Sequence, residues 1–194
     1  MTITVVSSPQ MLMLDARLRA DSTSIQRTNR RSIYEKCHYH PCLSHQTIIF
    51  PVESVNNRSE IAAILCSTTP ISKAKLDGIQ HIHVSFADIT DAKRFDAFHI
   101  EKAQRIKKFV DNLEGIRVLY VCCDSGESRS TAVTAAILRY WKRNEMKIWK
   151  NAYFHPNPLV YHLLSKAFGC PSTKLRALLL SQHNKRLFRK QIQS

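Results

Sequence analysis

The chain has 194 residues, of which 44% are hydrophobic and 23% are charged. This composition is that of a soluble globular protein and excludes a disordered chain, and the length is enough to bury a core without stabilising disulfides. Lys and Arg together number 29 against 15 Asp and Glu, which gives a formal net charge of +14. Such a charge favours acidic partners, namely phosphorylated proteins, nucleic acid or an anionic membrane surface.

The six cysteines lack the regular spacing of a small disulfide-rich domain, and two of them are adjacent. No apolar run approaches the length of a membrane span, and the N-terminal residues lack the basic region of a secretory signal. We therefore expect one domain over residues 1–194, in a reducing, cytoplasmic compartment and without a transmembrane segment.

The first fifty residues carry only weak signals of regular structure. Residues 2–6 alternate β-branched side chains and predict a short strand, and residues 9–19 follow a Ser-Pro break and predict a helix. Residues 21–45 are polar without a clean period, which indicates a loop or an insertion. Two cysteines and three histidines in residues 37–45 could bind zinc, but their spacing matches no standard finger, so a polar surface loop is favoured. Residues 47–50 predict another strand.

Strands and helices then alternate along the chain. Residues 60–66 are an apolar run that ends in a Ser-Thr-Thr-Pro turn, and residues 81–86 alternate apolar and polar side chains, so both predict strands. Residues 98–113 carry apolar side chains at helical spacing, and Gly115 ends that predicted helix. This order of elements predicts an α/β domain with parallel crossover connections.

The most informative stretch joins a predicted strand, residues 116–121, to a predicted helix, residues 132–140. A loop of small residues lies between them, and this layout aims backbone N–H groups at an anion on the helix N-terminus. Cys123 lies at the end of the strand, and Arg129 closes the loop after five intervening residues. A thiol surrounded by amides, a helix N-terminus and a guanidinium is a ready nucleophile. The planar fork of Arg129 suits two phosphate oxygens.

The C-terminal part is strongly basic, since the last 49 residues contain no Asp or Glu. Residues 159–168 predict one helix, and residues 171–194 predict a basic helix whose leucines at positions 175, 178 and 179 form an apolar side. A packed helix with a solvated basic face is favoured. The alternatives left open are binding to nucleic acid or another acidic partner, and binding to a membrane surface.

The segment Cys123-x5-Arg129-Ser130, with Gly126 and Ser128 between, resembles the signature loop of the cysteine-dependent protein tyrosine phosphatases. The form Cys-x-x-Gly-x-Ser-Arg-Ser is most similar to the dual-specificity branch and its bacterial relatives. The resemblance implies a three-layer α/β/α fold with a central mixed, mostly parallel sheet, and the loop between a strand and a helix.

The resemblance also implies a role for each loop residue. Cys123 would attack phosphorus, and Ser130 would help the phosphorylated intermediate break down. The substrate's phosphate would be bound by Asp124, Ser125, Gly126, Glu127, Ser128 and Arg129. No cofactor or metal is implied, because fixed amide dipoles and a guanidinium already hold the phosphoryl charge.

The general acid of the resembled family is an Asp about thirty residues before the cysteine. Asp88 and Asp91 both follow the predicted strand 81–86 and compete for this role. Asp88 is favoured because the register of the strand fixes its direction, whereas the length of the following loop can vary. The alternative for either residue is a structural Asp in a turn.

Four side chains bear on substrate and activity. The acids Asp124 and Glu127 would repel a highly charged substrate, which favours phosphotyrosine, or phosphoserine and phosphothreonine, on proteins over RNA 5′ ends or nucleotides. Cys122 stands where the family usually has His, so a catalytically weak, phosphate-binding pseudophosphatase stays open. In several relatives an upstream cysteine traps the nucleophile as a disulfide. Cys66 is the candidate, although a buried core residue is the simpler interpretation.

Overall fold

The computed structural model describes residues 1–7, 57–68 and 76–192. The elements predicted at 9–19 and 47–50, and the segment 21–45 with its zinc-capable side chains, lie outside these ranges. The described strands form one sheet in the order β1-β4-β2-β3, with every pair parallel. Their bounds are β1 (Thr2–Ser7), β2 (Ile61–Leu65), β3 (Gln80–His83) and β4 (Val118–Cys123).

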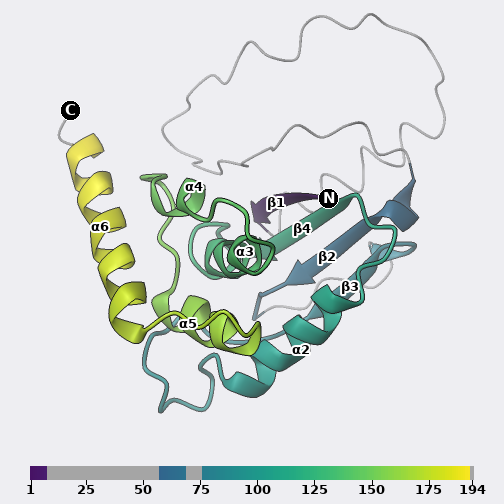
Figure 1. Cartoon of the computed structure of the whole chain (residues 1–194), viewed down its shortest axis with the longest axis horizontal. Helices are drawn as coiled ribbons and strands as arrows, with labels where there is room; N and C mark the ends of the chain where they lie inside the picture. The colour runs from purple at the N-terminus through teal and green to yellow at the C-terminus, as the bar shows by residue number, and fades with distance from the viewer. Residues whose placement is uncertain (8–56, 69–75, 193–194) are drawn as a thin grey trace, which may run out of the picture.

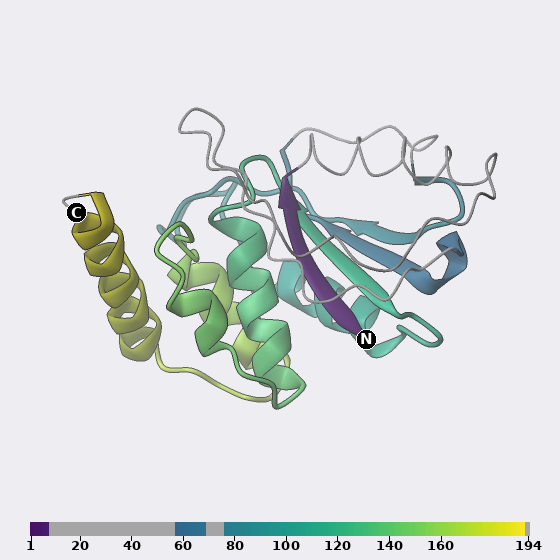
Figure 2. The same cartoon turned by 90° about the horizontal axis from the view of Figure 1, so that it is seen from above.

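Helices follow the strands and pack beside the sheet (Figure 1). A short 3-10 helix, η1 (Arg58–Glu60), leads into β2, and the connection between β3 and β4 contains a longer helix. The helices are α2 (Ile100–Asp111), α3 (Arg129–Tyr140), α4 (Met146–Trp149), α5 (Pro158–Ala167) and α6 (Lys174–Ile192). Helix α6 lies at the end of the molecule farthest from the sheet in both views (Figures 1 and 2).

Strand β4 lies inside the sheet, between β1 and β2, and its side chains alternate between two buried clusters. Leu119, Val121 and Cys123 belong to the larger cluster, which also contains buried apolar residues of α2, α3 and α5. Tyr120 and Cys122 point to the other face. Because β4 is interior and buried on both faces, its carboxyl end is held in place from all sides.

The predicted α/β class is confirmed, and so is the position of the loop between a strand and a helix. Every strand pair in the described ranges is parallel, so they contain no antiparallel part of the expected mixed sheet. The buried apolar residues of the described helices lie in the larger cluster, except Leu159, and none lies in the smaller one. The described ranges therefore supply one helical layer of the two expected.

Two boundaries at the loop differ from the sequence prediction. Strand β4 continues through Cys123, and α3 begins at Arg129 instead of at residue 132. The N-cap of α3 is Ser128, whose side chain makes no capping hydrogen bond and whose hydroxyl donates to Asp88. The Thr131 hydroxyl hydrogen-bonds the carbonyls of Glu127 and Ser128 at 2.6 and 2.8 Å and closes the first turn.

The last helix, α6, buries a different side from the one that the sequence predicted. Leu175, Leu178 and Leu179 are 66%, 49% and 55% exposed, whereas Ala177 and Asn184 are buried. The Asn184 amide donates to the carbonyls of Trp149 and Asn151, so a polar side chain docks this helix against the α4 segment. The leucine side of α6 therefore faces solvent. None of the described helices is long and apolar enough to span a membrane.

Candidate functional site

The loop after β4 folds back over the sulfur of Cys123. The Gly126 amide donates a hydrogen bond to Cys123 Sγ at 3.2 Å, and Ser130 Oγ lies 3.1 Å from the same sulfur. Gly126 has φ +79°, a left-handed conformation that glycine adopts without strain and that turns its N–H toward the sulfur. Ser130 lies inside α3 instead of capping it, so its hydroxyl faces the thiol.

Arg129 begins α3 and is only 7% exposed. Its Nη1 donates to the backbone carbonyl of Phe86 at 3.1 Å, and its Nη2 donates to Asp124 Oδ2 at 2.5 Å. The third nitrogen, Nε, is buried and has no hydrogen-bond partner within the described part of the chain. A buried guanidinium with an unsatisfied N–H has the chemistry of an anion site, because leaving that donor unpaired costs stability until an acceptor arrives.

Of the two candidate acids, the structure brings Asp88 to the loop. Asp88 Oδ1 accepts a hydrogen bond from Ser128 Oγ at 2.9 Å and another from Asn157 Nδ2 at 2.8 Å. Asp88 is otherwise exposed, so its carboxyl is held at the mouth of the loop and remains open to solvent. Asp91 accepts the backbone N–H of Lys93 at 3.0 Å and so stabilises its own turn.

Asn157 is a residue of the site that the sequence analysis missed. It is 3% exposed and donates to both Asp88 and the carbonyl of Ile89, while its Oδ1 accepts the N–H groups of Leu159 and Val160 and caps α5. An Asn directly before Pro158 is a signature of a helix start, so the cap was readable from the sequence. The bond to Asp88 was not, because it joins positions far apart in the chain.

The same segment also anchors the backbone of the loop. The N–H of His155 donates to the Glu127 carbonyl at 2.9 Å, and the N–H of Asn157 donates to the Ser128 carbonyl at 3.4 Å. Ser125 Oγ accepts the Glu127 N–H at 3.3 Å. Ser125 and Glu127 therefore shape the loop through these bonds, and the Glu127 carboxylate is not bound to Arg129.

The cysteines beside the nucleophile position divide between the two faces of the sheet. Cys122 is fully buried on the face opposite Cys123, and burial raises the pKa of its thiol. Cys66 is buried in the same cluster as Cys123. Burial, reinforced by the nearby Cys123, raises the pKa of Cys66 as well, although Arg129 acts in the opposite direction. Both Cys122 and Cys66 are therefore neutral thiols at physiological pH.

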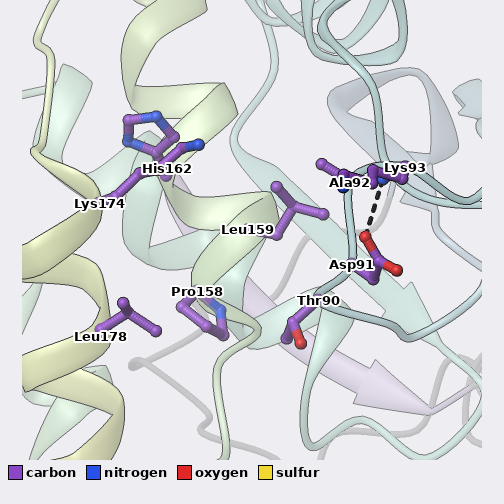
Figure 3. Close-up of a pocket in the computed structure, with 9 residues that line it drawn as sticks. All are labelled: Thr90, Asp91, Ala92, Lys93, Pro158, Leu159, His162, Lys174 and Leu178. Atoms are coloured by element: carbon purple, nitrogen blue, oxygen red, sulfur yellow. Dashed lines mark hydrogen bonds between the residues drawn. The ribbon is translucent and has the colours of Figure 1, made fainter.

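A pocket of about 320 Å³ adjoins the acid segment, which we define as residues 88–93 (Figure 3). Its three walls come from residues 90–93, from the start of α5 and from α6. Its lining residues are Thr90, Asp91, Ala92, Lys93, Pro158, Leu159, His162, Lys174 and Leu178. The side chains of Pro158, Leu159 and Leu178 make it largely apolar, and Leu178 is one of the exposed leucines of α6.

Solved structures that are similar to this chain include those of three phosphatases. The phosphatase domain of Yvh1 from Chaetomium thermophilum is 18% identical, with 58% of this chain and 81% of that chain covered, at a TM-score of 0.41. Tk-PTP in its active form is 17% identical, with 66% of this chain and 78% of that chain covered, at a TM-score of 0.36. PTPMT1 in complex with PI(5)P is 16% identical, with 70% of this chain and 81% of that chain covered, at a TM-score of 0.32. No protein-family model and no curated protein matches the chain.

Proposed function

We propose that the chain is a cysteine phosphatase that needs no metal and hydrolyses phosphomonoesters on proteins. The observation that carries this proposal is the contact of Cys123 Sγ with the Gly126 amide at 3.2 Å and with the Ser130 hydroxyl at 3.1 Å. A loop N–H that already points at a thiol, directly before the first turn of a helix, supports a site that stabilises a thiolate and the oxygens of a bound phosphate.

In the first step the Cys123 thiolate attacks phosphorus, an S–P bond forms and the bond from phosphorus to the ester oxygen breaks. Asp88 gives its proton to that oxygen, so the leaving group departs as a neutral alcohol or phenol. Loop amides and Arg129 hold the non-bridging oxygens, where charge is concentrated in the transition state. The carboxyl of Asp88, fixed by Ser128 and Asn157, supports its role as the acid.

In the second step water attacks the cysteinyl-phosphate, and the carboxylate of Asp88 now accepts the proton of that water. The S–P bond breaks, inorganic phosphate leaves and Cys123 returns as a thiolate. The Ser130 hydroxyl, at 3.1 Å from the sulfur, donates a hydrogen bond that stabilises the leaving thiolate. Proton and phosphoryl group therefore balance over the two steps, and the enzyme ends in its starting state.

Turnover is favoured over phosphate binding alone, although Cys122 replaces the usual His. Cys122 lies on the far face of the sheet and cannot orient the loop. The loop is instead held by the backbone bonds from His155 and Asn157 and by the Ser128 bond to Asp88. These contacts supply the rigidity that a phosphate cradle needs, so we expect the site to be preorganised for catalysis.

A protein substrate is favoured by two features beside the loop. Asp124 and Glu127 place two acids next to the phosphate position, which disfavours polyphosphorylated ligands by repulsion. The apolar pocket beyond Asp88 suits a side chain next to the phosphorylated residue. A phosphatase acting on RNA 5′ ends or nucleotides is the second candidate, because the net charge is +14.

Rates on a phosphotyrosine peptide, a phosphoserine peptide and 5′-triphosphorylated RNA test the proposal, with Cys123→Ser as the control. We expect the fastest hydrolysis on a phosphopeptide and none by the variant. Preference for the RNA would establish the second candidate. Absence of turnover on all three, with phosphate still bound, would establish a pseudophosphatase. We further propose a cytoplasmic location for the protein. We also propose that the basic helix α6 binds an acidic partner, and salt-dependent binding to RNA or to an acidic peptide would test this second proposal.

A further inference from the structure

Asp124 already occupies one donor of the arginine that would bind the phosphate. Its Oδ2 lies 2.5 Å from Arg129 Nη2, and the side chains are 42% and 8% exposed respectively. Nη2 and Nε lie along the same edge of the guanidinium plane, the edge that binds two oxygens at once. Nε has no partner within the described ranges. Of the two nitrogens on this edge, Nη2 is therefore held by a carboxylate of the same loop, whereas Nε has no partner among the described residues.

A phosphate bound across this edge needs an N–H of Nη2, so Asp124 and the substrate compete for the same guanidinium nitrogen. Two anions at the same guanidinium edge also repel each other. Nη1 lies outside this edge and already donates one hydrogen bond to the Phe86 carbonyl. Since the Asp124 side chain is partly exposed, it can turn into water when phosphate arrives, whereas the buried Arg129 stays in place.

We propose that Asp124 is a specificity-determining residue that acts as a built-in competitor of the substrate for Arg129. The Asp124 carboxylate pairs with Nη2, and an incoming anion must displace it to bind across the Nε–Nη2 edge. A dianionic phosphate monoester, which offers two oxygens and two charges, displaces Asp124, whereas a monoanionic phosphodiester does so poorly. The substrate part of this inference rests on the proposed function, but the competition for Arg129 does not require turnover.

The competition is tested by the affinity for inorganic phosphate, measured by calorimetry in a Cys123→Ser background. Asp124→Asn removes the charge of the competitor and keeps its size. Glu127→Gln is the matched variant, because it removes one charge from the same loop at a carboxylate that does not pair with Arg129. We expect Asp124→Asn to tighten phosphate binding by about threefold to tenfold, the range for a charge-assisted pair with one exposed partner. The shift for Glu127→Gln should be clearly smaller.

Equal shifts in the two variants would mean that only the charge of the loop matters, and would overturn the inference. Weaker phosphate binding by Asp124→Asn would also overturn it, since Asp124 would then be holding Arg129 in its active position. Asp124→Ala provides a second removal of the carboxylate, and thermal melting checks that each variant is folded.

Active enzyme gives an independent readout. In the otherwise unchanged chain, Asp124→Asn should lower KM for an aryl phosphate and narrow the preference for a phosphate monoester over an aryl phosphodiester, with kcat changing less. Asp124→Glu keeps a carboxylate in the loop, so its KM and its preference for the monoester should lie between those of the unchanged chain and those of Asp124→Asn. If no variant hydrolyses any ester, the proposed function fails, while the calorimetric comparison still decides whether Asp124 competes for Arg129.

Discussion

The side-chain amide of Asn157 donates a 2.8 Å hydrogen bond to Asp88, and thereby ties the candidate acid to the N-terminus of α5. The same Asn caps that helix through its Oδ1. A second hydrogen bond, from Ser128 in the loop after β4, reaches the same Asp88 oxygen. The acid, the loop and α5 are therefore fixed relative to one another by three side chains from separate parts of the chain.

Replacing Asn157 should therefore impair catalysis through the position of Asp88. We expect Asn157→Ala to lower kcat by about tenfold to a hundredfold, because a misplaced acid transfers its proton poorly. It should also destabilise the fold by about 1 kcal/mol through the lost cap. Asn157→Asp separates the two effects, since a carboxylate still caps α5 but repels Asp88. A variant with the lost cap, lowered stability and unchanged kcat would show that Asn157 does not position the acid.

The two candidate acids are distinguished by single substitutions. Asp88→Ala should lower kcat by about a hundredfold or more at unchanged affinity for inorganic phosphate, because a general acid acts only in the transition state. Asp91→Ala should leave kcat nearly unchanged, since Asp91 bonds to its own turn at Lys93. Steady-state kinetics on an aryl phosphate measure both. The reverse ranking would assign the acid to Asp91.

Peroxide treatment distinguishes the two interpretations of Cys66, a buried core residue and a reversible trap for an oxidised nucleophile. Peroxide converts the Cys123 thiolate to a sulfenic acid, and the Cys66 thiolate then attacks that sulfur, forms a disulfide and releases water. Because burial raises the pKa of Cys66, we expect trapping to become faster as pH rises. Mass spectrometry of peroxide-treated protein should show a Cys66–Cys123 peptide.

Two variants control the trapping experiment. Cys66→Ser should abolish the disulfide and make inactivation by peroxide irreversible, whereas Cys122→Ser should not, because Cys122 faces the other side of the sheet. A disulfide that involves Cys122, or no disulfide at all, would contradict the proposed trap.

The pocket between the acid segment and α6 should contribute to binding of a peptide but not of a small ester. Leu178→Asp introduces a charge at its apolar wall and should raise KM for a phosphopeptide severalfold, with little effect on an aryl phosphate. Leu175→Asp is the matched control, because Leu175 is exposed on the same helix and does not line the pocket. Equal effects of the two substitutions on the peptide would argue against the pocket.

The parts of the site that lie close together in sequence could be predicted from it. The distance along the chain from Cys123 to Arg129, and the apolar strand and helix on either side, were sufficient to place the candidate loop between β4 and α3. The preference for Asp88 over Asp91 also came from local strand register. In each case the backbone geometry of a few neighbouring residues determines where the side chain lies.

The contacts between distant segments could not be predicted in this way. Nothing local indicates that Asn157 reaches Asp88, or that the carbonyl of Phe86 accepts a bond from Arg129. The packing of α6 was predicted with the wrong face, because apolar periodicity alone favoured burial of its leucines. Asn184, which is polar, docks that helix through two backbone carbonyls, and this register leaves Leu175 and its neighbours exposed.

Capture of the covalent intermediate tests the proposed chemistry most directly. An aryl phosphate is mixed with the protein in the presence of a chelator, the reaction is quenched rapidly in acid, and the peptides are analysed by mass spectrometry. Ser130→Ala should make the intermediate easier to capture, because loss of the hydroxyl slows its breakdown. We predict one phosphoryl group on the peptide that contains Cys123, and neither adduct nor turnover in Cys123→Ser. Hydrolysis that persists in Cys123→Ser, or a phosphoryl group on another residue, would contradict a cysteine phosphatase.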